Sequence, residues 1–427
     1  SGFPVYKTLL CEVTLASAEK LQGEESEASD NPAAASAEPD APPEHTVYLD
    51  HNATTPVDEA VLQAMLPFFQ HEWGNPSSVH AAGGRARAAV EGARRQVALA
   101  LGCTARRVVF TGGGSEANNL AIKGVMAAGG HVITCAVEHP AVLATCRALL
   151  PMGVELTVLP VDGDGLIHPE DLRAALRPDT VLVSIMAANN ETGTIQPIAE
   201  LAQILRGHPA LLHCDAVQAL GKMALDVDEL GVDLLSLSSH KVYGPKGVGA
   251  LYVRKGVSLT PLVDGGGQEH GLRSGTENVP GIVGFGKACE IALRRLHQGE
   301  PKRLAGLRDR LEAGVLERVA GARRNGPKDN RLCNTASITL PGIRGESLVL
   351  HLDRRGIWFS SGSACKSGNP DPSHALLAMG LSPEDAHCVV RFSLGHSNSA
   401  ADIELVLVEL DETLRHAATM VRFMGCR

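Results

Sequence analysis

Side chains that could do chemistry follow three of the short apolar runs in this sequence. Asp215 ends the run at 210–215, Lys241 follows the run at 232–239, and His139 follows a third run. Short β-branched apolar runs predict buried strands. Folds built from parallel strands bind their ligands at the carboxyl ends of those strands. We therefore expect a ligand site at this edge of a sheet.

Lys241 and Asp215 each have two interpretations. A loop lysine is either a solvated charge or a desolvated amine that forms a Schiff base with a carbonyl compound. Asp215 is either a helix N-cap or a buried carboxylate that pairs with a cationic ring nitrogen. Ser238 and His240 add the hydroxyl and imidazole donors that a phosphate requires. Gln218, three residues after the aspartate, could reach a phenolic oxygen on the same ring.

A glycine-rich segment, TGGGSEANN, occupies residues 111–119 between a predicted strand and a predicted helix. Glycines at such a turn let backbone N–H groups approach a phosphate, and the start of a helix favours an anion. Gly114 and Ser115 are the candidate contacts. The alternative is a tight turn with a capping serine. The segment matches neither GxGxxG nor the P-loop pattern.

Three further residues are candidates for binding. His139 precedes Pro140 at a predicted helix start, so it is a cap, a buried structural histidine, or a ring that stacks on an aromatic cofactor. Asn190 follows a strand and has an amide to donate. Arg391 interrupts an apolar strand, and a buried arginine clamps a carboxylate from either a neighbouring side chain or a substrate.

Cys365 stands apart from the other nine cysteines because its surroundings, SSGSACKSGNP, are rich in serine and glycine. This composition predicts exposure, which suits a nucleophile. Lys366 beside it favours the thiolate. Several other cysteines, such as Cys135 and Cys214, lie in apolar runs and behave as small hydrophobic residues. The scattered spacing, without a CxxC pair, indicates a reducing compartment, and we expect a cytoplasmic protein.

The composition excludes other classes. The formal net charge is −9, but seven acids and no lysine or arginine lie between residues 23 and 45. The remainder is almost neutral, which argues against a nucleic-acid surface. No apolar run has the length to span a bilayer, so we expect no membrane partner. The spacing of histidines and cysteines predicts no metal site.

The order of elements predicts an α/β protein. Residues 1–45 form an N-terminal extension that contains an acidic, disordered linker. Strands then alternate with amphipathic helices, which implies a mainly parallel sheet with both faces covered. We assign residues 61–295 to this large domain. Residues 46–60 and 296–427 are assigned to a smaller α+β domain, which carries Cys365.

Taken together, these motifs resemble those of one family. The segments VYLDHNATTP, WGNPSS, ANNETG, HCDAVQALGK, SSHKVYGPKG, RSGTEN and SSGSAC occur in this order across about residues 46–420. They are similar to the NifS/IscS-type cysteine desulfurases of the aminotransferase class V group. The resemblance implies fold-type I, with a seven-stranded, mainly parallel sheet, and pyridoxal 5′-phosphate (PLP) as the cofactor. Two features depart from the family pattern: Lys366, where a threonine or serine is usual, and the N-terminal extension.

The resemblance also implies a role for each candidate residue. Lys241 would be the Schiff-base lysine, Cys365 the nucleophile that becomes a persulfide, and His139 the ring that stacks on the cofactor. Asp215 and Gln218 would contact the ring nitrogen and the phenolic oxygen. The phosphate and substrate contacts would be Gly114, Ser115, Ser238, His240, Asn190 and Arg391, with Thr276 reaching the phosphate of a partner subunit.

The activity implied is the conversion of L-cysteine to L-alanine by a homodimer, with sulfur passed to an acceptor such as an iron–sulfur scaffold protein. Four alternatives compete with it. A selenocysteine lyase would share the fold and the lysine, and a PLP-dependent C–S lyase would not need Cys365. A non-catalytic binding subunit would be expected to lack Lys241 or Cys365, and a nucleotide-binding protein would need an acidic ribose partner.

Overall fold

The computed structural model describes residues 46–362 and 371–424. The predicted nucleophile Cys365, its neighbour Lys366 and the extension at 1–45 lie outside the described residues. Residues Pro43–Arg427 belong to one compact unit. In the described ranges, no helix is both long and apolar enough to cross a membrane.

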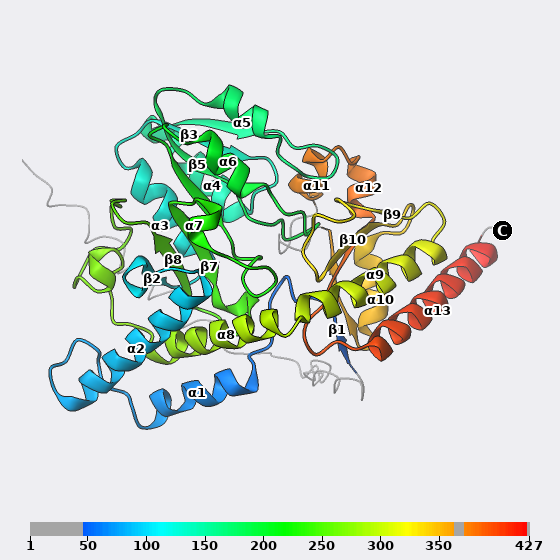
Figure 1. Ribbon diagram of the computed structural model, residues 1–427. Helices are drawn as coiled ribbons and strands as arrows, with labels where there is room; N and C mark the ends of the chain where they lie inside the picture. Colours follow the sequence, from blue (N-terminus) through cyan, green and yellow to red (C-terminus); the bar gives the residue numbers. More distant parts are fainter. Residues whose placement is uncertain (1–45, 363–370, 425–427) are drawn as a thin grey trace, which may run out of the picture. The chain divides into compact units, whose positions relative to one another are not determined.

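A seven-stranded sheet forms the centre of the larger part of this unit (Figure 1). Its strands are β2 (Val108–Thr111), β3 (His131–Cys135), β4 (Glu155–Leu159), β5 (Thr180–Ser184), β6 (Leu211–Asp215), β7 (Leu234–Ser238) and β8 (Gly249–Val253). Their order is β2-β8-β7-β6-β5-β3-β4, and only β8 runs antiparallel to its neighbours. The prediction of a mainly parallel sheet of seven strands is confirmed.

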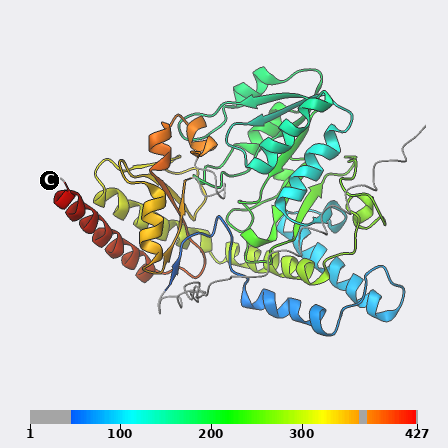
Figure 2. The same cartoon turned by 180° about the vertical axis from the view of Figure 1, so that it is seen from behind.

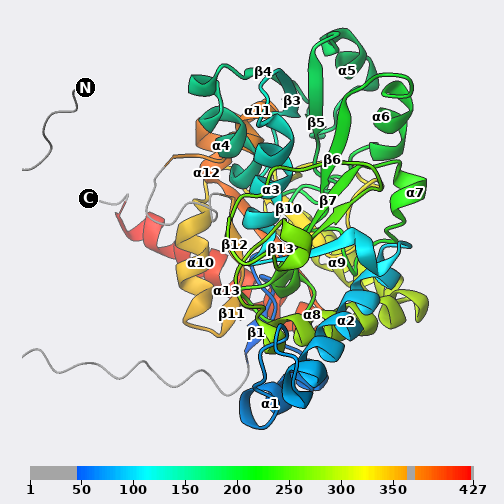
Figure 3. The same cartoon turned by 90° about the vertical axis from the view of Figure 1, so that its left-hand side faces the viewer.

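Helices cover both faces of this sheet. Successive side chains of a strand point to opposite faces, and in these strands both faces carry apolar side chains. Phe110 of β2 packs into one hydrophobic cluster and its neighbour Val109 into another. The helices are α1 (Glu59–Gln70), α2 (Ala81–Ala100), α3 (Gly114–Met126), α4 (Pro140–Ala148), α5 (Pro169–Ala175), α6 (Ile198–Ile204), α7 (Val227–Leu230) and α8 (Val279–His297). In Figure 3, α3 and α4 lie on one side of the sheet, and α6 and α7 lie on the other.

Most of the C-terminal elements surround a second hydrophobic cluster, whereas Ala375, Leu376 and Ala386 pack into the same cluster as Phe110. The strands are β9 (Arg323–Arg324), β10 (Thr335–Thr339), β11 (Ile357–Trp358), β12 (Ser360–Ser361) and β13 (Val389–Ser393). The helices are α9 (Glu300–Arg318), α10 (Gly345–Asp353), α11 (His374–Ala378), α12 (Pro383–His387) and α13 (Ala400–Met424). Four strands form an antiparallel sheet in the order β12-β13-β10-β9. Helices α9 and α13 lie side by side (Figure 1).

The first described strand, β1 (Val47–Tyr48), joins these C-terminal elements rather than the large sheet. It pairs in parallel with β11, with Val47 opposite Ile357. Figure 2 shows this dark-blue strand beside the yellow and red elements. Val47 and Leu49 are buried in the same cluster as Leu304 and Phe392. The division into domains at residues 60 and 295 stays a prediction.

Candidate active site

One cavity of about 770 Å³ lies where the carboxyl ends of the large sheet face β13. Its walls include the predicted residues Gly114, Ser115, His139, Asn190, Asp215, Gln218, Ser238, His240, Lys241 and Arg391. Thr276 is exposed and is not part of the wall. The loops after β2, β3, β5, β6 and β7 supply most of these side chains, because parallel strands end at the same edge.

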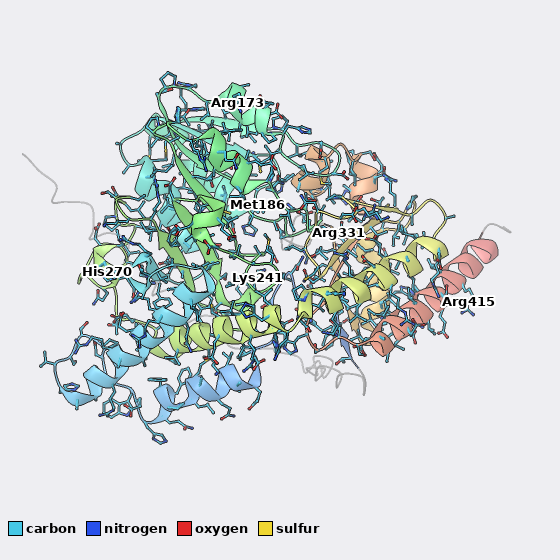
Figure 4. The ribbon with its side chains drawn as sticks, viewed as in Figure 1. Arg173, Met186, Lys241, His270, Arg331 and Arg415 are labelled. Atoms are coloured by element: carbon cyan, nitrogen blue, oxygen red, sulfur yellow. The ribbon has the colours of Figure 1, made fainter. Side chains whose placement is uncertain are left out.

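Lys241 is half-buried at the end of a 3₁₀ turn that follows β7. Its Nζ donates hydrogen bonds to the carbonyl oxygens of Asn52 and Ala53, each at 2.6 Å. Figure 4 labels this lysine and Met186, another residue of the cavity wall. The side chain therefore faces the cavity and is not the solvated loop charge that was the alternative.

Asp215 is 5% exposed at the end of β6. Its carboxylate accepts hydrogen bonds from Asn118 Nδ2 at 2.7 Å and from the backbone N–H of Val217 at 3.0 Å. No cationic side chain forms an ion pair with it within residues 46–362 and 371–415. A buried carboxylate with hydrogen bonds but no cation suits a ligand that brings a positive charge.

Two positions of the glycine loop at the start of α3 favour glycine, one for its backbone conformation and one for lack of space. Gly113 has a φ of +150°, a conformation that favours glycine. A Cβ at Gly114 would lie 2.7 Å from Cγ2 of Val217 and 3.3 Å from Cβ of Ser238. The first turn of this 13-residue helix therefore faces the cavity with its backbone N–H groups. Arg273 pairs with Glu116 at 2.9 Å, which reduces the negative charge beside this anion site.

Both histidines of the cavity are neutral near pH 7. His139 is the N-cap of α4, and its Nδ1 accepts the backbone N–H of Ala141 at 3.1 Å. Burial lowers its pKa, so a neutral ring with Nδ1 as acceptor carries its proton on Nε2. Burial, and then the charge of Lys241, lower the pKa of His240 to about 4. His139 is thus both a cap and part of the cavity wall.

Arg391 lies in the middle of β13 with 3% of its surface exposed. Its Nη2 donates to Asp50 at 2.8 Å and to Ser360 at 3.0 Å, and its Nη1 donates to the carbonyl of Asn190 at 3.1 Å. The side chain thus has a carboxylate partner within the chain and also lines the cavity. Asp50 holds the guanidinium of Arg391 in one orientation. This group would therefore be oriented before a ligand carboxylate binds.

Comparison with known proteins agrees with this geometry. Residues 47–406 match the family model described as aminotransferase class V. The chain belongs to the aminotransferase class V family. Cysteine desulfurase IscS of Dictyoglomus turgidum is 48% identical over 378 residues, which are 88% of this chain and 96% of that protein. Cysteine desulfurase IscS of Methanosarcina thermophila is 47% identical over 88% of this chain and 93% of its own length.

Solved structures are similar to this chain. A NifS-like protein has a TM-score of 0.82 and 40% identity, over 87% of this chain and all of its own. A structure titled SspA in complex with cysteine has a TM-score of 0.72 and 40% identity, over 82% of this chain and 99% of its own. The predicted resemblance to NifS/IscS-type proteins is confirmed.

Two asparagines of this class V site escaped the sequence analysis. Asn118 donates a hydrogen bond to Asp215 and orients it. The backbone carbonyl of buried Asn52 accepts a hydrogen bond from Lys241, and its Nδ2 donates to the carbonyl of Asn190 at 3.1 Å. Both lie in motifs that were recognised, SEANN and LDHNATTP. Their partners are far away in the sequence, so no local pattern revealed these contacts.

Glu138, also unpredicted, is a buried carboxyl group next to His139. Its Oε1 accepts the backbone N–H of Met186 at 2.6 Å and the thiol of Cys135 at 3.3 Å, whereas its Oε2 has no partner among the described residues. Burial, and then the charge of Asp215, raise the pKa of Glu138 to about 8. Near pH 7 this carboxyl keeps its proton.

Proposed function

We propose that this class V chain is a PLP-dependent cysteine desulfurase, which converts L-cysteine to L-alanine and moves the sulfur onto Cys365. One observation carries the proposal: the cavity that contains buried Asp215, which pairs with no cation of the described residues, also contains Lys241 and Arg391. A cofactor with a cationic ring nitrogen, an aldehyde and a phosphate suits the carboxylate, the amine and the start of α3. Relatives named cysteine desulfurase, at 46–48% identity, support the substrate.

The residues fit PLP as follows. Asp215 would pair with the ring nitrogen, and Gln218 would donate to the phenolic oxygen. His139 would stack on the ring, and Lys241 would hold the cofactor covalently. The remaining contacts, to the phosphate, would come from Gly114, Ser115, Ser238 and His240. Bound PLP supplies an electron sink for the bonds broken at the substrate carbons.

The protein side chains then handle the substrate. Arg391, fixed by Asp50, would bind the carboxylate of cysteine together with Asn190. Lys241, once displaced by the substrate amine, would accept the proton of the α carbon as a neutral amine. His139 is neutral with its proton on Nε2, and it would be placed to give a proton to the reacting groups or to take one from them.

Sulfur transfer would use Cys365. On one side of its segment Ser360 accepts from Arg391 of the cavity wall, and on the other Ser373 donates at 2.6 Å to Glu191, the residue after Asn190 of that wall. The Cys365 thiolate would attack the substrate sulfur, so that an S–S bond forms and the carbon–sulfur bond breaks. The electron pair of that bond stays with carbon, where protonation yields alanine, and the enzyme keeps a persulfide.

We propose the same assembly that the resemblance implied. Large apolar side chains are exposed around α1 and α2, including Trp73 at 76% and Val79 at 98%, and exposed patches of this kind suit a subunit interface. Exposed Thr276 would reach the phosphate in the partner subunit. The sulfur acceptor would be an iron–sulfur scaffold protein in the cytoplasm. The large domain would span residues 61–295, with residues 46–60 and 296–427 as the small domain.

A direct test combines colour with chemistry. The purified protein should take up PLP, absorb visible light, and release alanine from cysteine while a persulfide forms on Cys365. Lys241→Ala should lose both the absorbance and the activity, whereas Cys365→Ser should keep the absorbance and lose sulfur transfer.

Three outcomes would overturn the proposal. A colourless protein that cannot be reconstituted with PLP would exclude the cofactor. Full cysteine turnover by Cys365→Ser, without a persulfide, would indicate a C–S lyase. Much faster turnover of selenocysteine than of cysteine would indicate a selenocysteine lyase.

A further inference from the structure

A second, smaller cavity of about 40 Å³ lies behind Lys241. Lys241 lines both cavities, and Lys222 lines only the smaller one. Other residues of its wall are His51, Tyr243, Arg295, Glu300, Asn334 and His396. The catalytic lysine thus has a second lysine close behind it, on the side away from the proposed cofactor.

Lys222 is joined to Lys241 through two intermediate groups. Lys222 Nζ donates to Oε1 of Gln218 at 2.9 Å. Gln218 Nε2 donates to the carbonyl oxygen of Asn52 at 2.9 Å, and this oxygen also accepts from Lys241 Nζ. The order of contacts is therefore Lys222, Gln218, Asn52, Lys241.

This contact determines which way the Gln218 amide faces. In its protonated form Lys222 has three donors and no acceptor, so this ammonium group meets the amide oxygen and not the amide nitrogen. The NH₂ group is then turned away from Lys222, toward Asn52 and the larger cavity. Gln218 also lines that cavity, so its second N–H is available there as a donor.

Stability alone does not account for a lysine at position 222. In the described ranges no carboxylate forms an ion pair with it. Burial, and then the charge of Lys241, lower its pKa to about 7. The charge of Arg391 lowers the pKa of Lys222 further. An apolar side chain of similar length would avoid this desolvation cost.

We propose that Lys222 is a positioning residue, which holds Gln218 with an N–H directed at the phenolic oxygen of the cofactor and places a second positive charge behind Lys241. This inference rests on the proposed function, because it assumes that PLP occupies the larger cavity. Lys222 itself touches neither cofactor nor substrate. Its effect on the cofactor passes through Gln218 and through charge repulsion with Lys241.

The test compares PLP binding by Lys222→Met with the parent protein and with Lys255→Met, which removes an exposed lysine. The dissociation constant comes from absorbance titration of the cofactor-free protein, and urea unfolding checks the fold. Loss of one hydrogen bond should weaken PLP binding about five- to tenfold. The visible absorbance maximum should also shift, while Lys255→Met matches the parent in both measurements.

A double variant tests whether Lys222 acts through Gln218. In a Gln218→Ala background, Lys222→Met should weaken PLP binding less than it does in the parent. Lys222→Arg, which keeps the donor and the charge, should restore most of the affinity. This variant also keeps the test informative if Lys222→Met fails to fold.

The inference is wrong if Lys222→Met leaves affinity and absorbance unchanged, or if its effect is equally large without Gln218. It is also wrong if only the unfolding free energy changes. In each of these cases the parent protein still binds PLP. Failure of the parent itself to bind PLP would instead overturn the proposed function.

Discussion

Asp215 and Glu269 are both buried carboxylates, but the chain surrounds them in opposite ways. Glu269 receives two hydrogen bonds from Arg94, at 2.6 and 2.7 Å, and a third from the backbone N–H of Phe110. Asp215 receives an amide and a backbone N–H, and no cation of the described chain. Arg94 balances the charge of Glu269 without a ligand, whereas a cationic ligand would balance the charge of Asp215.

Glu138 shows a third way to bury a carboxyl group. It has no cationic partner in the part of the chain that the structure describes and no place in the cavity wall, and it keeps its proton instead. Burial alone thus does not mark a functional acid. The useful distinction is whether the charge is balanced by the chain, removed by a proton, or left for a ligand to balance.

The largest effect should follow from Asp215→Asn. The amide has the same shape but only one acceptor oxygen for the two donors at Asp215, and it cannot balance a cationic ring nitrogen, so turnover of cysteine should fall ~10³–10⁴-fold. Without cofactor, the unfolding free energy should stay equal or rise, because a buried charge is removed. Alanine formation and urea unfolding measure the two effects. Asp353→Asn, at the exposed end of α10, is the matched control; unchanged turnover in Asp215→Asn would contradict the comparison.

Glu269→Ala should give the opposite result. It leaves buried Arg94 with the exposed Glu91 as its remaining carboxylate partner, which should lower the unfolding free energy by ~3–5 kcal/mol. The affinity of the folded protein for PLP should change little. Removing Arg94 as well, in Arg94→Met with Glu269→Ala, should recover part of the lost stability. A large fall in PLP affinity with unchanged stability would reverse the roles of the two carboxylates.

Glu138→Gln tests the third arrangement through pH. The unfolded chain loses this proton near pH 4.5, whereas the folded chain holds it until about pH 8. The fold therefore loses stability as the pH rises through that window. Glutamine has no proton to lose, so between pH 5 and 9 the variant should gain ~2–4 kcal/mol relative to the parent. Urea unfolding of the cofactor-free proteins measures this, with exposed Glu346→Gln as a control that should show no such gain.

Arg391→Lys should have the smallest effect of the four. Lysine keeps the charge but lacks the planar fork that meets a carboxylate with two donors. The KM for cysteine should rise roughly 10- to 50-fold, equivalent to about 1.4–2.3 kcal/mol, with the visible absorbance of bound PLP unchanged. Arg344→Lys, at an exposed position, should match the parent. An unchanged KM would mean that Arg391 serves only Asp50 and Ser360.

Sequence patterns predicted the strands better than they predicted where the strands end. The apolar run continues from residue 180 to residue 188, but β5 stops at Ser184. Ile185 and Ala187 still donate to carbonyls of the β6 segment, at His213 and Asp215. Beyond them the chain turns into the cavity wall, where Met186, Ala188 and Asn190 lie. The residues after Ser184 are apolar as well, because the wall of the cavity is also buried.

The order of the chemical residues, their places after apolar runs and the resemblance to NifS/IscS-type proteins were all present in the sequence itself. Local patterns determine these features, because strands, turns and helix starts depend on near neighbours. The tertiary structure showed where several of these side chains lie. It showed Lys241 facing the cavity, His139 as both cap and wall, and Arg391 held by Asp50. Those contacts join segments up to 341 residues apart, and the order of strands in the sheets, which no local pattern reveals, is what brings them together.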